Sequence, residues 1–213
     1  MRCVRVIAAW AMAAGFAVCA AQAGIATDPN GMPAWRGSKT FESSPARYLH
    51  VVVEYCVYGS AGFKKSFGVD FGPGKYVYAY QIYNDCADHP WPVPEERDYV
   101  RVLTVGLDGD ELAANPGYVD LVGHQNPNNT SIAVTSAKFR FSSPTLNYGS
   151  KSDVLYFTSP YYPEWDYATV SGNLTAPTPP QTDTLPSPVP EPATLGFISL
   201  ATLFSLAKTR RRR

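Results

Sequence analysis

The middle of the chain alternates apolar and polar side chains. In residues 49–58 the odd positions hold Leu, Val, Val, Tyr and Val, whereas the even positions include His50 and Glu54. Side chains of a β-strand point alternately to opposite faces of a sheet, so this period of two predicts a strand with one apolar face. A second strand is predicted over 76–84, directly after the turn-forming residues 72–74.

Three further segments, 99–107, 132–141 and 154–158, repeat this pattern. Asp-Gly at 108–109 and Asn-Pro-Gly at 115–117 are predicted to be turns. No stretch of ten residues between the two ends of the chain has the 3.6-residue period of an amphipathic helix. We therefore predict an all-β fold, an antiparallel β-sandwich of jelly-roll or immunoglobulin-like type, with a single core.

Residues 1–23 are predicted to be a secretory signal peptide. A cationic start precedes an apolar run, and a small-x-small exit follows at Ala21 and Ala23. The alternative is a retained membrane helix, but about 15 apolar residues fall short of the roughly 20 that span a bilayer. We expect cleavage after Ala23, so that the exported domain, 24–174, begins at Gly24.

The C-terminal end has three parts. Residues 175–190 include six prolines among Thr, Ser, Gln and Asp, which predicts a stiff, solvated linker over 175–188. An apolar run at 193–207 follows, and then a cluster of Lys and Arg. Fifteen helical residues reach about 22 Å, which crosses a hydrocarbon layer of about 30 Å only if the basic side chains snorkel. The basic cluster predicts a cytoplasmic end, and a plain membrane anchor with a proline-rich neck is one interpretation.

The segment 189–213 resembles the PEP-CTERM sorting signal. Its motif consists of Val189, Pro190, Glu191 and Pro192, followed by the short apolar helix and the arginines. The tyrosine-rich run 76–84 looks like a strand of PEP-CTERM exported domains, and 155–160 with 170–172 is similar to their late strand. The resemblance implies a β-rich bacterial envelope protein, anchored in the inner membrane until an exosortase processes it, and associated with exopolysaccharide or biofilm. It implies no catalytic residues.

The chain of 213 residues has a formal net charge of zero, but this balance hides an acidic middle. Seven of the 18 basic residues lie in the two terminal segments, so residues 24–192 hold 11 bases against 18 acids, a net charge of −7. Nucleic-acid binding requires clustered bases on the protein surface. Nucleic acid is therefore excluded as a partner.

Cys56 and Cys86 are the two cysteines that remain after removal of the signal peptide. In an oxidising compartment they are expected to form one disulfide. Closing a loop of about 30 residues would stabilise the fold by roughly 3–4 kcal/mol. The alternatives are two buried free thiols, or a metal pair, for which the accompanying Cys or His spacing is missing.

The sequence predicts no catalytic residue, cofactor or metal site. Gly-x-Ser-x-Gly and His-Glu-x-x-His motifs are absent, and residues 72–75 lack the Ser or Thr of a phosphate-binding loop. The three histidines, His50, His89 and His124, fall in separate segments. The acidic run 108–111 is interpreted as a solvated turn rather than a calcium loop.

The aromatic residues leave two interpretations open. Tyr76, Tyr78 and Tyr80 alternate, so a strand would place all three on one face. Facing outward, they would be glycan contacts that stack on sugar rings; facing inward, they would be core, which is the commoner use of tyrosine. The same choice applies to a second set, which consists of Trp91, Tyr161, Tyr162, Trp165 and Tyr167.

We therefore expect an exported cell-surface or extracellular-matrix protein that is structural, non-enzymatic and associated with exopolysaccharide. One alternative is a carbohydrate-binding module that uses an exposed tyrosine stripe. The other is a polysaccharide-modifying enzyme, which would require paired carboxyl groups at a cleft.

Overall fold

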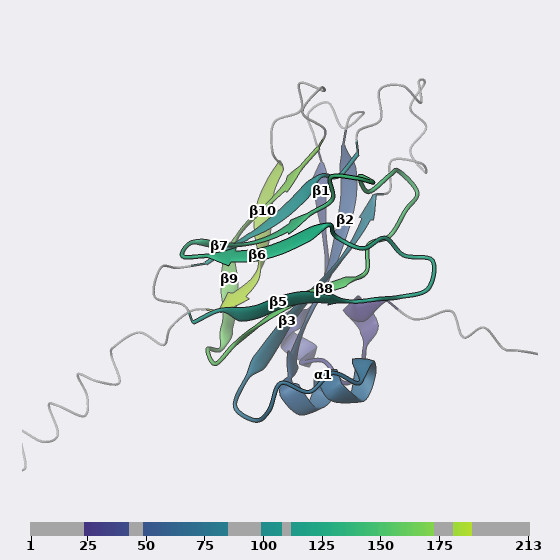
Figure 1. Cartoon of the computed structure of the whole chain (residues 1–213). Helices are drawn as coiled ribbons and strands as arrows, with labels where there is room; N and C mark the ends of the chain where they lie inside the picture. The colour runs from purple at the N-terminus through teal and green to yellow at the C-terminus, as the bar shows by residue number, and fades with distance from the viewer. Residues whose placement is uncertain (1–23, 43–48, 85–98, 108–111, 173–180, 189–213) are drawn as a thin grey trace, which may run out of the picture.

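Two antiparallel sheets make up the fold, seen in a computed structural model that describes residues 24–42, 49–84, 99–107, 112–172 and 181–188. The first sheet has the order β1-β2-β3-β8-β5, with β1 (Arg36–Glu42), β2 (His50–Gly59), β3 (Tyr76–Asn84), β8 (Val154–Ser159) and β5 (Ala114–Val119). The second has the order β10-β9-β4-β7-β6, with β10 (Gln181–Pro188), β9 (Pro163–Ser171), β4 (Val102–Gly106), β7 (Ser136–Arg140) and β6 (Asn129–Ala133). The predicted all-β sandwich is confirmed (Figure 1).

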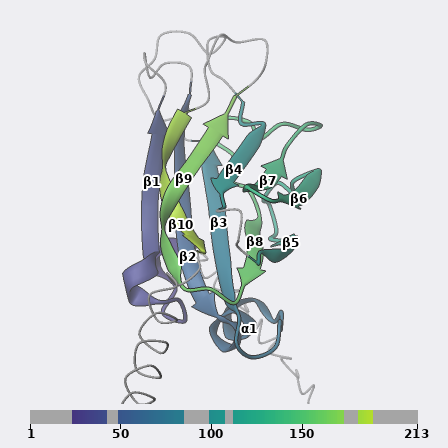
Figure 2. The same cartoon turned by 90° about the vertical axis from the view of Figure 1, so that its left-hand side faces the viewer.

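The main core lies between the two sheets, because each sheet turns its apolar face inward. The two sheets lie against one another (Figure 2), and the alternating apolar residues of β2 and β3 meet those of β4, β7 and β9. The core includes Val51, Val53, Val57, Tyr78, Tyr80, Ile82, Leu103, Val105, Phe139 and Val170. Full burial of a large apolar side chain contributes about 1.5–3 kcal/mol, so this layer is the main source of stability.

A second cluster covers the outer face of the first sheet. The helix α1 (Ser60–Phe67) places Phe63 against Tyr58 of β2, and the 3-10 helix η1 (Ile25–Thr27) inserts Ile25 beside them. Cys56 lies in the same cluster. The helix ends at Gly68, which adopts a φ of 77° and donates its N–H to the backbone oxygen of Lys64. β2 is thus buried on both faces along its second half, whereas the sequence predicts one apolar and one mixed face.

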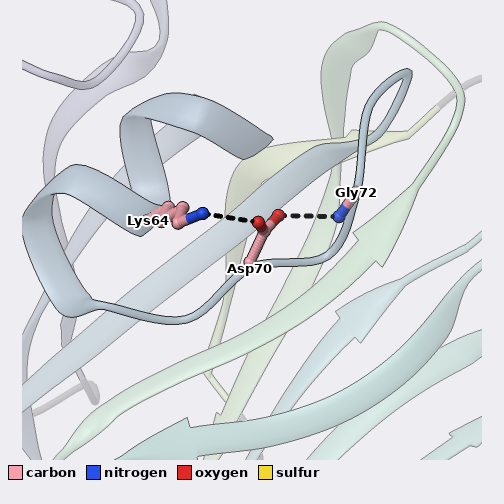
Figure 3. Close-up of polar contacts among 3 residues, drawn as sticks. All are labelled: Lys64, Asp70 and Gly72. Atoms are coloured by element: carbon pink, nitrogen blue, oxygen red, sulfur yellow. Dashed lines mark hydrogen bonds and ion pairs between the residues drawn. The ribbon is translucent and has the colours of Figure 1, made fainter.

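The connection from α1 to β3 is held by a polar clasp (Figure 3). The Lys64 ammonium lies 2.8 Å from Oδ2 of Asp70, and the N–H of Gly72 donates to Oδ1 of the same carboxylate at 2.9 Å. Gly72 and Gly74 have positive φ angles of 77° and 74°, which confirms the predicted turn over 72–74. An ion pair as exposed as this one adds little to stability, so its main effect is to fix the entry into β3.

Two local predictions are wrong. Residues 115–117, predicted as a turn between strands, lie inside β5, where Asn115 has a φ of 51° and the register shifts between Ala114 and Gly117. The segment 132–141, predicted as one strand, contributes to the hairpin of β6 and β7. The irregular backbone at 115–117 was predicted, but it interrupts a strand instead of joining two. The turn near 134, which joins β6 to β7, was not predicted.

The predicted linker 175–188 is wrong in its second half, because residues 181–188 form β10. This strand pairs with β9 from Gln181–Val170 to Pro188–Pro163. Leu185 is buried, and the Ser187 hydroxyl donates to the backbone oxygen of Gly106 at 2.6 Å. Proline is tolerated because β10 is an edge strand, where one side of the backbone has no ladder partner.

The other terminal predictions lie outside the described residues, namely the signal peptide 1–23 and the sorting segment 189–213. Within the described ranges, α1 has only eight residues and no helix meets the length and apolarity needed to cross a membrane.

Candidate glycan-binding surface

The tyrosine stripe of β3 faces the core. Tyr78 and Tyr80 are 0% and 1% exposed, and both stack near Phe157 of β8. Their hydroxyls donate to the backbone oxygens of Tyr161 and Pro186. A sugar ring needs a free aromatic face, so the predicted glycan contacts at Tyr78 and Tyr80 are wrong and the core interpretation holds for both. Tyr76, at the first position of β3, is half-buried.

The second aromatic set contributes instead to an exposed cluster, which we call the aromatic surface and define as Trp35, Tyr162 and Trp165. Tyr162 and Trp165 are 45% and 47% exposed. Trp35 ends the 3-10 helix η2 (Pro33–Trp35), and its ring lies 5.5 Å from Trp165 and 6.0 Å from Tyr162. The Trp35 indole N–H also donates to the Tyr162 hydroxyl at 3.2 Å. Three residues from separate elements thus form one continuous aromatic patch.

Two tyrosines of the first sheet support this patch from below. Tyr55 of β2 meets Trp165 edge to face at 5.5 Å, and Tyr76 of β3 meets Tyr162 edge to face at 5.7 Å. Burial raises the pKa of Tyr55, so its hydroxyl stays protonated at neutral pH. Edge-to-face pairs are the favoured aromatic geometry, worth about 0.5–1.5 kcal/mol each beyond area burial. The rings of the surface are therefore held in position before any ligand arrives.

Charged groups border the aromatic surface at Trp165. The Lys39 ammonium of β1 lies 5.6 Å from the centre of the Trp165 ring and 3.6 Å from Oδ1 of Asp183 in β10. Both charged side chains are about one-third exposed. A donor and an acceptor next to an aromatic platform are the groups that bind sugar hydroxyls, while the rings contact the apolar C–H faces of sugars.

The remaining members of the second set do not join the patch. Tyr167 of β9 is 45% exposed, but its hydroxyl donates to the backbone oxygen of Thr135 and its ring covers Gly106, so it packs over β4 and the turn between β6 and β7. Tyr161 is half-buried, and its N–H donates to the Ser159 hydroxyl. Trp91 lies outside the described residues.

Sequence reasoning missed Trp35, Tyr55 and Lys39. Trp35 and Tyr162 are 127 positions apart and meet only through the fold. The one signal available in the sequence is that Trp35 lies two residues after Pro33, in a segment that contains no predicted strand.

The predicted bond between Cys56 and Cys86 is not formed in the structure, where Cys56 is a buried free thiol; Cys86 itself lies outside the described residues. Cys56 pairs with Ala79, five residues before the end of β3 at Asn84. Five strand residues span roughly 17 Å and the two residues from Asn84 to Cys86 at most about 7 Å, whereas a disulfide needs Cα atoms within about 7 Å. The strand register therefore opposes the bond, and burial raises the pKa of the Cys56 thiol to about 11.

A separate polar cavity of about 390 Å³ lies on the outer face of the first sheet. Its lining includes Asp28, Lys65, Gln81, His124 and Lys151. His124 is held through Nδ1, which lies 3.0 Å from both the Gln81 amide nitrogen and the backbone oxygen of Ser152. Asp28 is the one carboxylate on the described lining. Burial tends to raise its pKa, but hydrogen bonds from the Ser66 hydroxyl, the Asn30 N–H and the Tyr58 hydroxyl together lower it.

Among the described residues, the cavity lining does not bring together the side chains of a catalytic site. His50 lies in β2 and His124 in the cavity, while His89 is outside the described part of the chain. The described ranges also contain no cluster of three His, Cys, Asp or Glu side chains with metal-binding geometry. Gly24 is described, whereas Ala21, Ala23 and the motif Val189–Pro192 lie outside.

The aromatic surface is therefore the feature best suited to bind an external ligand, and the fold that carries it is an antiparallel β-sandwich. Comparisons of the chain with protein-family models, with curated proteins and with solved structures find no match.

Proposed function

We propose that this chain is an exported, non-enzymatic protein of the bacterial cell envelope or extracellular matrix, which binds exopolysaccharide through the aromatic surface. The signal-peptide pattern at the N-terminus and the tail at 189–213, which resembles a PEP-CTERM signal, support export and processing by an exosortase at the inner membrane. The net charge of −7 over residues 24–192 supports a soluble exported domain.

One observation carries the glycan-binding part of the proposal. Tyr162 and Trp165 expose nearly half of their side chains although they sit in a supported cluster with Trp35. Exposed aromatic patches that are pre-positioned and bordered by polar groups are typical of binding sites. Tyr78 and Tyr80 have no part in this proposal, since both are buried, and Tyr76 contributes only by supporting Tyr162.

The enzyme alternative gains no support from the cavity. Glycoside hydrolysis uses two carboxyl groups about 5–10 Å apart that face the same bond. Among the residues described on the cavity lining only Asp28 is acidic, and its carboxylate is already engaged by Tyr58 and Asn30. The assignment to a jelly-roll or immunoglobulin-like subtype remains a prediction beside the simpler description as two five-stranded sheets.

Binding is tested by co-sedimentation of the processed protein with exopolysaccharide from its own host. Trp165→Ala and Tyr162→Ala should each weaken binding about tenfold, which corresponds to about 1.4 kcal/mol. Tyr167→Ala is the matched control, because Tyr167 is equally exposed but lies outside the aromatic surface. Unchanged binding in both surface variants would refute the assigned site, and loss of binding in the control as well would show a nonspecific effect.

Export and sorting are tested separately by the mass of the protein. Pro190→Ala or Glu191→Ala should leave a form that retains the tail, whereas Pro186→Ala in β10 should be processed normally. Identical processing of the motif variants and the wild type would contradict the sorting assignment without bearing on glycan binding.

A further inference from the structure

Glu54 presents a carboxylate oxygen that lacks a partner in the folded domain. Glu54 lies on β2 and faces outward from the first sheet, opposite Ser38 of β1 and Gln81 of β3. Its Oε2 atom is buried and makes no hydrogen bond. A buried charged oxygen without a partner costs several times more free energy than a hydrogen-bonded one, so a missing partner is expected.

The backbone of Gly24 lies against this oxygen. A Cβ atom added to Gly24 would collide with Oε2 of Glu54. Because the nitrogen and the Cβ position are bonded to the same Cα, the nitrogen of Gly24 lies within roughly 4.5 Å of Oε2. Ile25, the next residue, is 3% exposed and packed in the outer cluster with Tyr58 and Phe63, which fixes Gly24 in this place.

The signal-peptide prediction makes Gly24 the first residue of the exported protein. Before cleavage its nitrogen is an amide, which carries no charge and makes no hydrogen bond to Oε2 of Glu54. Cleavage after Ala23 would replace it with an ammonium group that has three donors and a positive charge, next to an unpartnered carboxylate.

We infer that Glu54 is a binding site for the α-ammonium group that signal-peptide cleavage creates at Gly24. This inference rests on the proposed export and on the position of the cut. It makes removal of the signal peptide a stabilising event for the sandwich, since the new ion pair ties the N-terminus to the centre of the first sheet. A Cβ at this position would require the Glu54 carboxylate to move away from the N-terminus.

The surroundings leave Glu54 available for this role. Its cross-strand neighbours Ser38 and Gln81 are uncharged. Arg36 shares the same face of β1, but its guanidinium donates to the backbone oxygen of Asp28 at 2.6 Å. The Asp28 carboxylate accepts from Tyr58 and Asn30. The other titratable groups on this face of β2 are His50, Cys56 and Tyr58, and His124 contacts Gln81.

The test measures the pKa of the α-amino group in the exported, processed protein. The full-length chain is expressed, the N-terminus is sequenced, and acylation of the α-amine is followed against pH by mass spectrometry. An ordinary α-amine titrates at about 7.7–8.0, and an opposite charge within about 6 Å raises such a pKa by about one unit or more. The wild type should show this rise, Glu54→Gln should return to the ordinary value, and Glu42→Gln, an exposed glutamate on β1, should match the wild type.

Stability provides a second measurement with a definite sign. Because the amine pKa is raised in the folded state, its contribution is complete below about pH 7.7 and is lost as pH rises through the folded pKa. The melting temperature of the wild type should therefore exceed that of Glu54→Gln at pH 7, and the difference should shrink by pH 10. An ordinary amine pKa in the native wild type, equal to that in urea, overturns the inference. A mature N-terminus other than Gly24 overturns it too, but leaves the glycan-binding proposal untouched.

Discussion

Trp165 of β9 packs edge to face against Tyr55 of β2, with ring centres 5.5 Å apart and ring planes at 85°. The two residues belong to opposite sheets, so this contact joins the sheets at the end of the sandwich where β8 turns into β9. The same indole contributes to the exposed aromatic surface. Stability and ligand binding therefore depend on the same ring, and the two effects must be separated by experiment.

The contact between Tyr55 and Trp165 should be visible as an energetic coupling. In a double-mutant cycle with Tyr55→Leu and Trp165→Leu, we expect a coupling of about 0.5–1.5 kcal/mol in the free energy of unfolding, measured in urea. The pair Tyr55→Leu and Tyr167→Leu serves as the control and should be additive, because Tyr167 packs on Gly106 instead. Additive effects in the first cycle would contradict the structural role of the ring pair.

The hydroxyl of Tyr80 should hold β10 in place. It donates across the sandwich to the backbone oxygen of Pro186, so Tyr80→Phe should cost about 1–2 kcal/mol and speed hydrogen exchange at the amides of β10. Tyr78→Phe is the matched control, since its hydroxyl donates to Tyr161 at 2.8 Å and does not reach β10. Exchange in β10 that is equal in both variants would show that this strand is held by other contacts.

Gly31 and Cys56 should be coupled through space. A Cβ added to Gly31 would collide with the Cys56 sulfur, so Gly31→Ala should destabilise the fold by about 1–3 kcal/mol. Cys56→Ala removes the sulfur, and the double variant should therefore lose less than the sum of the two single changes. Gly59→Ala is the control, because open space surrounds its Cβ position. Chemical denaturation of the wild type and the four variants measures the free energies of unfolding. Strictly additive effects of Gly31→Ala and Cys56→Ala would contradict the predicted collision.

Asp153 should make stability depend on pH. The Asp153 side chain is buried. Its Oδ1 atom accepts a hydrogen bond from the N–H of Leu121, and its Oδ2 atom has no hydrogen-bond partner. Burial raises the pKa of Asp153 above its ordinary value, so the folded state binds this proton more tightly than the unfolded state and stability falls as pH rises through that range. Asp153→Asn should therefore be more stable than the wild type at pH 7, and the difference should disappear near pH 3. Urea unfolding at both pH values measures the difference, and a variant that is less stable at pH 7 would contradict the prediction.

The strands with strict alternation were predictable from the sequence, and those without it were not. The predicted runs 49–58 and 76–84 correspond closely to β2 and β3, whose inward residues repeat every second position. β10 was misread as a linker because its prolines remove hydrogen-bond donors, a loss that an edge strand tolerates. The helix α1 has only eight residues, too few for its period to stand out.

The candidate site was predictable only in part. Tyr162 and Trp165 belonged to an aromatic set that the sequence could place either on the surface or in the core. They are exposed because they lie at one end of the sandwich, a position that the sequence alone does not give. Trp35 and Lys39 reach the same place from other strands and loops, which no local pattern encodes. The alternation of residues along β3 correctly predicted that Tyr78 and Tyr80 lie on the same face of the strand. That this face is buried follows only from the second sheet, which packs against it.

β10 ends at Pro188, and the residues that resemble a sorting motif begin at the next position. An enzyme that cuts at this motif would have to work almost in contact with the finished sandwich, since each residue of chain adds at most about 3.6 Å of reach. The order of strand pairing and cleavage then matters. If β10 pairs with β9 before the cut, the folded domain would restrict access of the enzyme to the motif.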